Sequence, residues 1–223
     1  MRMRLKKHLD ERIAATQNVL AARESEKFYE MTDEQKAAFN LNLPAIFAND
    51  NPIKLEIGCG KGAFAIQSAQ NNPDVNFLAV EKLSNVIVVA CEQALPLNLN
   101  NLRFLNCRAE NLCCFLPDNS ISEILLNFSC PYPKKTYANR RLTSKNFLKI
   151  YQKLLVSGGI IRLKTDNETF FDYSVESLTE FGFEVTDVCR NLPQDAKGNV
   201  VTEYEAKFRA LGLPIFALAA TIK

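Results

Sequence analysis

The sequence predicts one α/β domain with a mostly parallel sheet, an antiparallel strand near the C-terminus and helices on both faces. From residue 52 onward, short apolar runs alternate with helical patterns, which is typical of βαβ units. Near the end, a polar turn and a helical segment separate the last two apolar runs, which indicates two closing strands, one of them antiparallel. A chain of 223 residues with 47% apolar residues suits one such core and hardly two.

The first 50 residues are charged and rich in helix formers. Thr32 or Asp33 is the expected N-cap of a helix that begins at EQKAAF. A basic segment at the start is either a tail or an RNA-contacting arm, and its cations are Arg2, Arg4, Lys6 and Lys7. We therefore predict a helical and basic extension over 1–50, followed by the main domain over 51–223, together forming one structural unit.

The remaining elements follow from the same alternation of patterns. Strands are expected at 53–57, 75–81, 102–107, 121–128, 158–164, 183–192 and 214–222. Helices are expected at 61–70, 83–95, 142–155 and 202–212, with another beginning near Asn167. A polar turn containing Asp195 and Gly198 precedes the last of these helices.

Composition excludes several classes of protein. A net charge of +2 is too small to indicate nucleic-acid binding by itself, so any basic surface must come from local clustering. No apolar stretch of about 18 residues predicts a membrane span, and no apolar run follows the first cations as in a signal peptide. The seven cysteines form no C-x-x-C pair and His8 is the only histidine, so we expect no metal site, reduced buried thiols and a cytoplasmic location.

A glycine loop follows the first predicted strand, in the order Gly58-Cys59-Gly60-Lys61-Gly62. Glycines at such a turn let the backbone approach a ligand at the N-terminus of the next helix. The residues fit a dinucleotide loop loosely, an S-adenosylmethionine loop of the form E/D-x-G-x-G-x-G, or a structural turn. Glu56 favours the methyl donor, because a carboxylate attracts its sulfonium and ammonium groups and repels a pyrophosphate. Glu81 ends the second strand, where it could bond ribose hydroxyls in either case.

The segment Ser129-Cys130-Pro131-Tyr132 ends the fourth predicted strand, at the sheet edge where open α/β folds bind ligands. Its polar atoms and its ring could present acceptors and a stacking face to a flat base. Four cations follow, which form either a phosphate-binding patch or solvated surface: Lys134, Lys135, Arg140 and Arg141.

At this level of detail the chain resembles the bacterial tRNA (guanine-N(7)-)-methyltransferase family. The matching motifs are MRMR, LEIGCGKG, VEKLSNVIVVA, LNFSCPYPKK with RRLT after it, LKTDN (163–167) and TEYEAKF (202–208). They keep the family's order and spacing along nearly the whole chain. The resemblance implies a Rossmann-like class I methyltransferase that uses S-adenosyl-L-methionine to methylate N(7) of a guanine in the variable loop of tRNA.

The resemblance also implies roles for single residues. Donor binding falls to Glu56 and Glu81 together with the loop glycines Gly58 and Gly60. Substrate binding falls to Lys134, Asp166, Thr202, Glu203, Tyr204 and Glu205. Partners other than tRNA are not implied, and we expect no membrane, no metal, and a monomer or homodimer.

Two positions depart from the family pattern. Arg108 stands at an aspartate position of the donor site, and Cys130 replaces the catalytic, donor-contacting aspartate of S-D-P-W, while Tyr132 replaces the tryptophan.

Guanine N(7) has a free lone pair, so the carboxylate at position 130 would only stabilise positive charge that grows on the ring. Two unit charges about 4 Å apart interact by roughly 4 kcal/mol at a dielectric constant of about 20. Losing an interaction with a partial charge would then cost about 1 to 3 kcal/mol, or roughly a tenfold to hundredfold loss of rate.

Two rival functions follow from these departures. S-C-P-Y also resembles the [S/N/D]-x-P-[Y/F] motif of methyltransferases that act on exocyclic amines. Loss of both aspartates would also suit a tRNA-binding protein without catalysis, whereas Glu56, Glu81, Lys134 and T-E-Y-E favour an enzyme.

Overall fold

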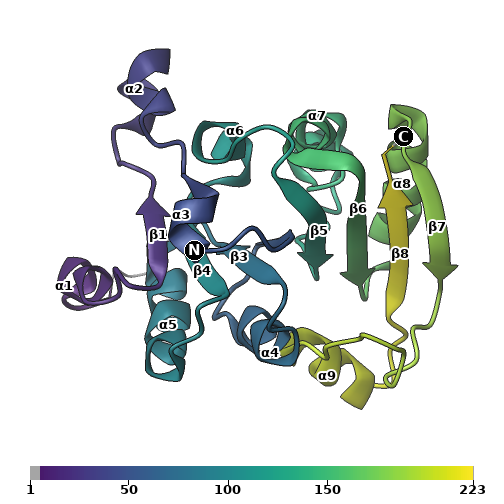
Figure 1. The fold of residues 1–223 in the computed structure, drawn as a ribbon. Coiled ribbons are helices and arrows are strands. Elements are labelled where there is room, and N and C mark those ends of the chain that lie inside the picture. Colours follow the sequence, from purple (N-terminus) through teal and green to yellow (C-terminus); the bar gives the residue numbers. More distant parts are fainter. Residues whose placement is uncertain (1–5, 223) are drawn as a thin grey trace. The chain divides into compact units, whose positions relative to one another are not determined.

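The structure is a computed structural model that describes residues 6–222, so the predicted basic residues Arg2 and Arg4 lie outside the described part. Figure 1 draws the helices and strands of the chain. The chain forms two compact units. Unit 1 consists of Met1–Pro52 and Gly58–Pro117, and unit 2 of Ile53–Ile57 and Asp118–Lys223. The predicted boundary after residue 50 stays a prediction.

Unit 1 is built on parallel strands. β4 (Leu102–Asn106) pairs on one side with β3 (Asn76–Val80) and on the other with β1 (Leu20–Arg23). Every residue of β3 is buried, which explains its continuous apolar run. The helices α4 (Ala63–Asn71) and α5 (Ser84–Ala94) pack against these strands, and the shorter η2 (Leu95–Leu97), η3 (Ala109–Asn111) and α6 (Leu112–Phe115) complete this part.

The first 50 residues contain a strand that the sequence analysis did not predict, β1. The helices expected there are short: α1 (Leu9–Ala14), η1 (Phe28–Glu30), α2 (Asp33–Ala37) and α3 (Leu43–Phe47). The predicted N-cap is confirmed, since the Thr32 side chain accepts from the Gln35 N–H and the Gln35 side chain accepts from the Thr32 N–H. α1 packs on α5, where Arg12 and Glu92 form two hydrogen bonds of 2.6 Å each.

Unit 2 is a mixed sheet. β2 (Ile53–Ile57), β5 (Ile121–Asn127) and β6 (Leu155–Thr165) run parallel. β8 (Phe216–Thr221) pairs antiparallel with both β6 and β7 (Glu184–Cys189). The prediction of a mostly parallel sheet with an antiparallel strand near the C-terminus is therefore confirmed.

The helices of unit 2 follow its strands in the predicted order. They are α7 (Lys145–Leu154), α8 (Glu168–Phe181) and α9 (Glu203–Ala210). The short η4 (Lys135–Arg140) was not predicted. α8 packs on β6, β7 and β8, and its residues Phe170 and Phe171 are fully buried. Asn167 caps α8 by accepting the Phe170 N–H, so the cap is not the neighbouring Asp166.

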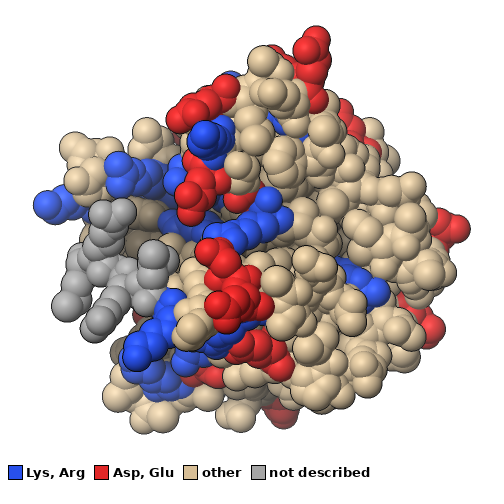
Figure 2. All heavy atoms as spheres, turned by 90° about the vertical axis from the view of Figure 1, so that its left-hand side faces the viewer, with Lys and Arg blue, Asp and Glu red and all other residues tan. Residues whose placement is uncertain are grey.

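Charges on the visible surface are mixed in sign. Figure 2 shows Lys and Arg lying beside Asp and Glu on the face that Figure 1 has at its left. In unit 1, ion pairs of this kind join Arg12 to Glu92 and Arg23 to Asp10. Within residues 6–222, no helix is both long and apolar enough to span a bilayer.

Candidate functional site

The glycine loop directly follows β2 along the chain and belongs to unit 1. Gly58 and Cys59 both donate their N–H groups to the Val80 carbonyl, at 2.8 and 2.9 Å, which fixes the loop against the end of β3. Gly62 is the N-cap of α4 and has φ +81°, and a Cβ there would lie 2.8 Å from that of Ala90. Both the backbone angle and the lack of space therefore require glycine at this position.

Glu81 follows β3 and is half-buried. Its Oε1 accepts the Leu83 N–H at 2.9 Å, and its carbonyl accepts from Asn106 Nδ2 at 2.7 Å. Asn106 in turn accepts from the Ser84 hydroxyl at 2.7 Å. The Glu81 carboxylate is thus held at the carboxyl end of the strand, where its second oxygen can accept a hydroxyl.

Arg108 follows β4 and contacts the N-terminal part of unit 1. Its Nη1 donates to the Tyr29 hydroxyl at 2.8 Å, and its guanidinium lies 5.0 Å from the centre of the Tyr29 ring. The Arg108 N–H donates to Glu24 Oε2 at 2.9 Å. Neither Tyr29 nor Glu24 was predicted to lie here, because no sequence pattern indicates that β1 pairs with β4.

Glu56 of β2 is a buried carboxylate in unit 2. Only 4% of the residue is exposed, and Asn127 Nδ2 donates to its Oε1 at 3.0 Å. Its Oε2 is buried without a hydrogen-bond partner among the described residues. Burial raises the pKa of Glu56 to about 7, although the Asn127 bond and the charge of Lys164 lower it. A buried acid with one unpaired oxygen suits a cationic ligand group.

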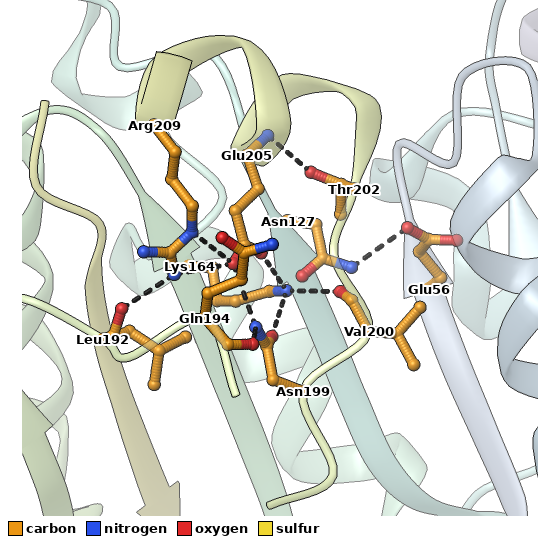
Figure 3. Close-up of polar contacts among 10 residues, drawn as sticks. All are labelled: Glu56, Asn127, Lys164, Leu192, Gln194, Asn199, Val200, Thr202, Glu205 and Arg209. Atoms are coloured by element: carbon orange, nitrogen blue, oxygen red, sulfur yellow. Dashed lines mark hydrogen bonds and ion pairs between the residues drawn. The ribbon is translucent and has the colours of Figure 1, made fainter. Parts of the chain in front are cut away.

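Lys164 lies at the centre of a buried network in unit 2 (Figure 3). Its Nζ donates to Glu205 Oε2 at 2.8 Å, to Asn199 Oδ1 at 3.0 Å and to the Val200 carbonyl at 2.9 Å. Arg209 donates to Glu205 Oε1 at 2.7 Å and to the Leu192 carbonyl at 2.7 Å. Burial lowers the pKa of Lys164 below its ordinary value, and the hydrogen bond to Glu205 raises it only in part.

The T-E-Y-E segment divides into an inner and an outer half. Thr202 caps α9 by accepting the Glu205 N–H at 2.9 Å, and Glu205 itself is fully buried. Tyr204 is 59% exposed, and its ring stacks on Phe128 and Phe208 with centroids 6.3 Å from each. Glu205 therefore positions α9 from inside, while Tyr204 and the exposed Glu203 face outward.

The S-C-P-Y segment is a strained loop held by one arginine. Phe128 and Tyr132, which lie on either side of Cys130, have φ +51° and +41°, uncommon values for residues other than glycine. Arg141 donates from Nε to the Pro131 carbonyl at 3.0 Å and from Nη2 to that of Tyr132 at 3.1 Å. Cys130 itself is exposed and carries a free thiol.

Arg141 is thus a structural residue. It is only 6% exposed, and its guanidinium also lies 4.3 Å from the centre of the Tyr173 ring. Its burial does not fit the expectation that it contacts an RNA backbone. The other cations of that segment, Lys134, Lys135 and Arg140, are exposed, so they remain available to phosphates.

Each unit gathers part of the predicted site. Unit 1 brings Gly58, Gly60, Glu81 and Arg108 to the ends of its strands. Unit 2 joins Glu56 and Glu205 through residues that the sequence analysis did not single out: Asn127, Lys164 and Arg209. A signal for Lys164 did exist, because a cation in an apolar strand next to Asp166 needs a buried partner. Asp166 is half-buried and makes no ion pair with any described residue.

Comparison with known proteins decides the family. A family model described as "Putative methyltransferase" matches residues 50–218. A tRNA (guanine-N(7)-)-methyltransferase of Geobacillus thermodenitrificans is 46% identical over 176 residues, covering 78% of this chain and 82% of that protein. One of Bacillus licheniformis is 38% identical over 221 residues, covering 99% and 98%. The chain belongs to the tRNA (guanine-N(7)-)-methyltransferase family.

Solved structures of lower identity share the fold. The 16S rRNA methyltransferase KamB superimposes with a TM-score of 0.61 at 16% identity, covering 92% of this chain and 98% of its own. A SAM-dependent methyltransferase from Aquifex aeolicus gives 0.55 at 14% identity, covering 98% and 100%. The Rossmann-like class I prediction is confirmed. The dinucleotide alternative for the glycine loop is excluded by family membership.

Proposed function

We propose that this chain transfers the methyl group of S-adenosyl-L-methionine to N(7) of a guanine in the variable loop of tRNA. The proposal depends mainly on Glu56, which comes two residues before the glycine loop and whose Oε2 is buried without a hydrogen-bond partner among the described residues. Such a carboxylate suits the cationic end of a methyl donor and would repel a phosphate. We place this activity in the cytoplasm, in a monomer or homodimer.

The donor-binding residues are Glu56, Gly58, Gly60 and Glu81. When bound, the donor supplies an electrophilic methyl group on a sulfonium. Glu56 attracts its positive charges, and Glu81 accepts from its ribose hydroxyls. The loop glycines Gly58 and Gly60 have φ +86° and +58°, left-handed values that residues with a Cβ rarely adopt, so glycine lets the loop turn here beside the donor.

The acceptor-binding residues are Lys134, Asp166 and the segment from Thr202 to Glu205. Lys134 is exposed and can pair with a phosphate, while the Tyr204 ring can stack on an unpaired base. Glu205 acts from within by fixing the start of α9, which carries that ring. Asp166 offers an oxygen that no described residue occupies, so it can accept from a guanine amino or imino group.

Chemistry at N(7) makes few demands on the protein. The nitrogen attacks with its own lone pair, so no general base is needed, and orientation of the two reactants supplies much of the rate. Cys130 cannot offer the negative charge that an aspartate would place beside the ring. We expect a slower enzyme, by roughly tenfold to a hundredfold, for about 1 to 3 kcal/mol of lost electrostatic stabilisation.

The test is methyl transfer to an unmodified tRNA transcript, followed by identification of the methylated nucleoside. 7-Methylguanosine in the variable loop supports the proposal. A methylated exocyclic amine would instead assign the chain to the amine-directed class that its S-C-P-Y segment resembles. The matched control is Glu56→Gln, which should lose donor affinity and keep tRNA affinity.

A second candidate function is tRNA binding without catalysis, which Cys130 and Arg108 favour because neither supplies the carboxylate that the family has at that position. It predicts binding of unmodified tRNA, no transfer, and no binding of S-adenosylhomocysteine. Calorimetry with that product separates the two candidates, since an enzyme must bind it.

A further inference from the structure

Glu24 carries a carboxylate to the main chain of residue 108. It follows β1, where its N–H donates to the Asn106 carbonyl at 2.8 Å. Its Oε2 accepts the Arg108 N–H at 2.9 Å, and only 12% of its side chain is exposed. A carboxylate from the N-terminal segment therefore lies at the end of β4, where residue 108 is an arginine and supplies no carboxylate.

The Arg108 side chain points away from the end of β4 and contacts Tyr29. Its guanidinium donates to the Tyr29 hydroxyl and lies over the ring, 5.0 Å from its centre, while its Nε is 4.0 Å from Glu24 Oε1. A guanidinium has donors and no acceptor. A carboxylate has about four acceptor positions, of which the Arg108 N–H occupies one. The acceptor at this place is Glu24.

The location is where a nucleotide-like ligand would bind. β1, β4 and β3 are parallel, so their carboxyl ends lie at one edge of unit 1. That edge presents Glu24, Arg108 and Glu81, and open α/β sheets bind their ligands at such edges. The adenine of the donor carries an amino group, which needs an acceptor, and Glu81 is the acid proposed for its ribose.

We propose that Glu24 recognises the amino group of the donor's adenine, taking the part that an aspartate at position 108 would play. This inference rests on the proposed function, because it assumes S-adenosylmethionine as the donor. Arg108 then acts indirectly, holding Glu24 through its N–H and Tyr29 through its guanidinium. The unpredicted strand β1 thus delivers a residue of the donor site.

The experiment measures binding of two ligands to the full chain by calorimetry: S-adenosylhomocysteine, and S-inosylhomocysteine, in which a carbonyl oxygen replaces the amino group. The wild type should prefer the adenosyl ligand. Glu24→Gln should weaken that ligand by about tenfold to a hundredfold, the range for a hydrogen bond to a charged group. The same variant should bind the inosyl ligand at least as well as the wild type, because a glutamine amide can donate to the carbonyl oxygen that a carboxylate repels. The matched control is Glu26→Gln, an exposed acid on the same segment, which should change neither affinity.

A double variant tests whether the two positions share one role. Arg108→Asp in the Glu24→Gln background should restore the preference for the adenosyl ligand. Equal affinities in Glu24→Gln and the wild type would overturn the proposal, and so would an equal loss for both ligands at unchanged thermal stability. A wild type that binds neither ligand would refute the proposed function itself, before any variant is compared.

Discussion

Glu56 shows how burial of a single carboxyl can make ligand binding depend on pH. Its pKa is raised to about 7 by burial, above the value of 4.5 for a solvated glutamate. As the pH rises through that interval, the unfolded chain releases this proton while the folded chain keeps it. The free energy of unfolding therefore decreases over this window in the absence of ligand, since the folded state binds more protons.

The same proton gives the first prediction. A cationic donor favours the ionised form of Glu56, so donor affinity should rise between about pH 5 and pH 7 and level off above. Glu56→Gln should bind S-adenosylhomocysteine more weakly and without that rise. Titration calorimetry at several pH values measures both effects. A wild-type affinity that is flat over this range would mean that Glu56 is not the group that meets the cation.

Cys130 gives a prediction in the opposite sense, a gain of rate. Cys130→Asp should raise the rate at saturating donor by about tenfold to a hundredfold, because it restores roughly 1 to 3 kcal/mol of charge stabilisation. Cys130→Ser, which stays neutral, is the control and should change little. The affinity for tRNA should stay nearly constant in both variants.

An aspartate variant no faster than the wild type would mean that another acid already fills the role. Glu205 is not that acid, because both of its oxygens are bonded inside unit 2. Asp166 would then be the candidate, as a half-buried acid that pairs with no described residue.

At the scale of elements, one buried ion pair attaches α9 to β6. Lys164 is 12% exposed and Glu205 not at all, and the same lysine binds the turn at Asn199 and Val200. Removing one member of a buried pair leaves the other charge without compensation, which costs more than the pair itself contributes.

We therefore predict that Lys164→Met lowers the free energy of unfolding by about 3 kcal/mol, measured by urea denaturation. Arg209 still neutralises Glu205 in this variant, which keeps the loss at the lower end of the usual range. Lys207→Met, which removes an exposed cation from the same helix, should change it by less than about 0.5 kcal/mol. Similar losses in the two variants would show that the pair does not hold α9.

The elements also show what the sequence can and cannot predict. β2 matches its predicted range, and α5 and β8 fall within one or two residues of theirs, because apolar periodicity reflects burial directly. β1 was missed because LAAR is short and half-buried throughout, so no alternation marks it. Its partners lie about 80 positions further along the chain, as at Leu20 and Phe104, and a single sequence carries no signal of that pairing.

The candidate site divides in the same way. Glu56 and the loop glycines were predictable from the sequence, because the residues of a donor-binding loop lie within a few positions of one another and form a recognisable pattern. The Lys164 network and the Glu24–Arg108 contact depend on side chains that only the fold brings together. Arg141 was misread because its neighbours in the sequence are exposed cations, whereas its own side chain is buried under the S-C-P-Y loop.

At the scale of the whole molecule, a net charge of +2 leaves RNA affinity to local clusters. We predict that Lys134→Gln with Lys135→Gln weakens tRNA binding. The plot of log affinity against log salt has a negative slope, and it should become less steep by about one to two, from two lost phosphate contacts. Lys149→Gln removes an exposed lysine from α7 and should leave the slope unchanged. A filter-binding series over a range of salt concentrations measures it, and an unaltered slope in the double variant would make the segment solvated surface.

The pairing of β1 with β4 also affects the tendency of the protein to aggregate. Phe104 donates its N–H to the Val19 carbonyl at 2.8 Å, and Asn106 accepts from Glu24, so β1 covers the part of β4 from Phe104 to Asn106 on one side. A chain that began at Ser25 would leave that row of amides and carbonyls open beside apolar residues, a template on which further copies could add as strands. Light scattering of such a shortened chain should rise with protein concentration, and a monodisperse solution would contradict this. The N-terminal segment then has a second role besides the proposed donor contact: it covers a strand edge through which molecules could otherwise aggregate.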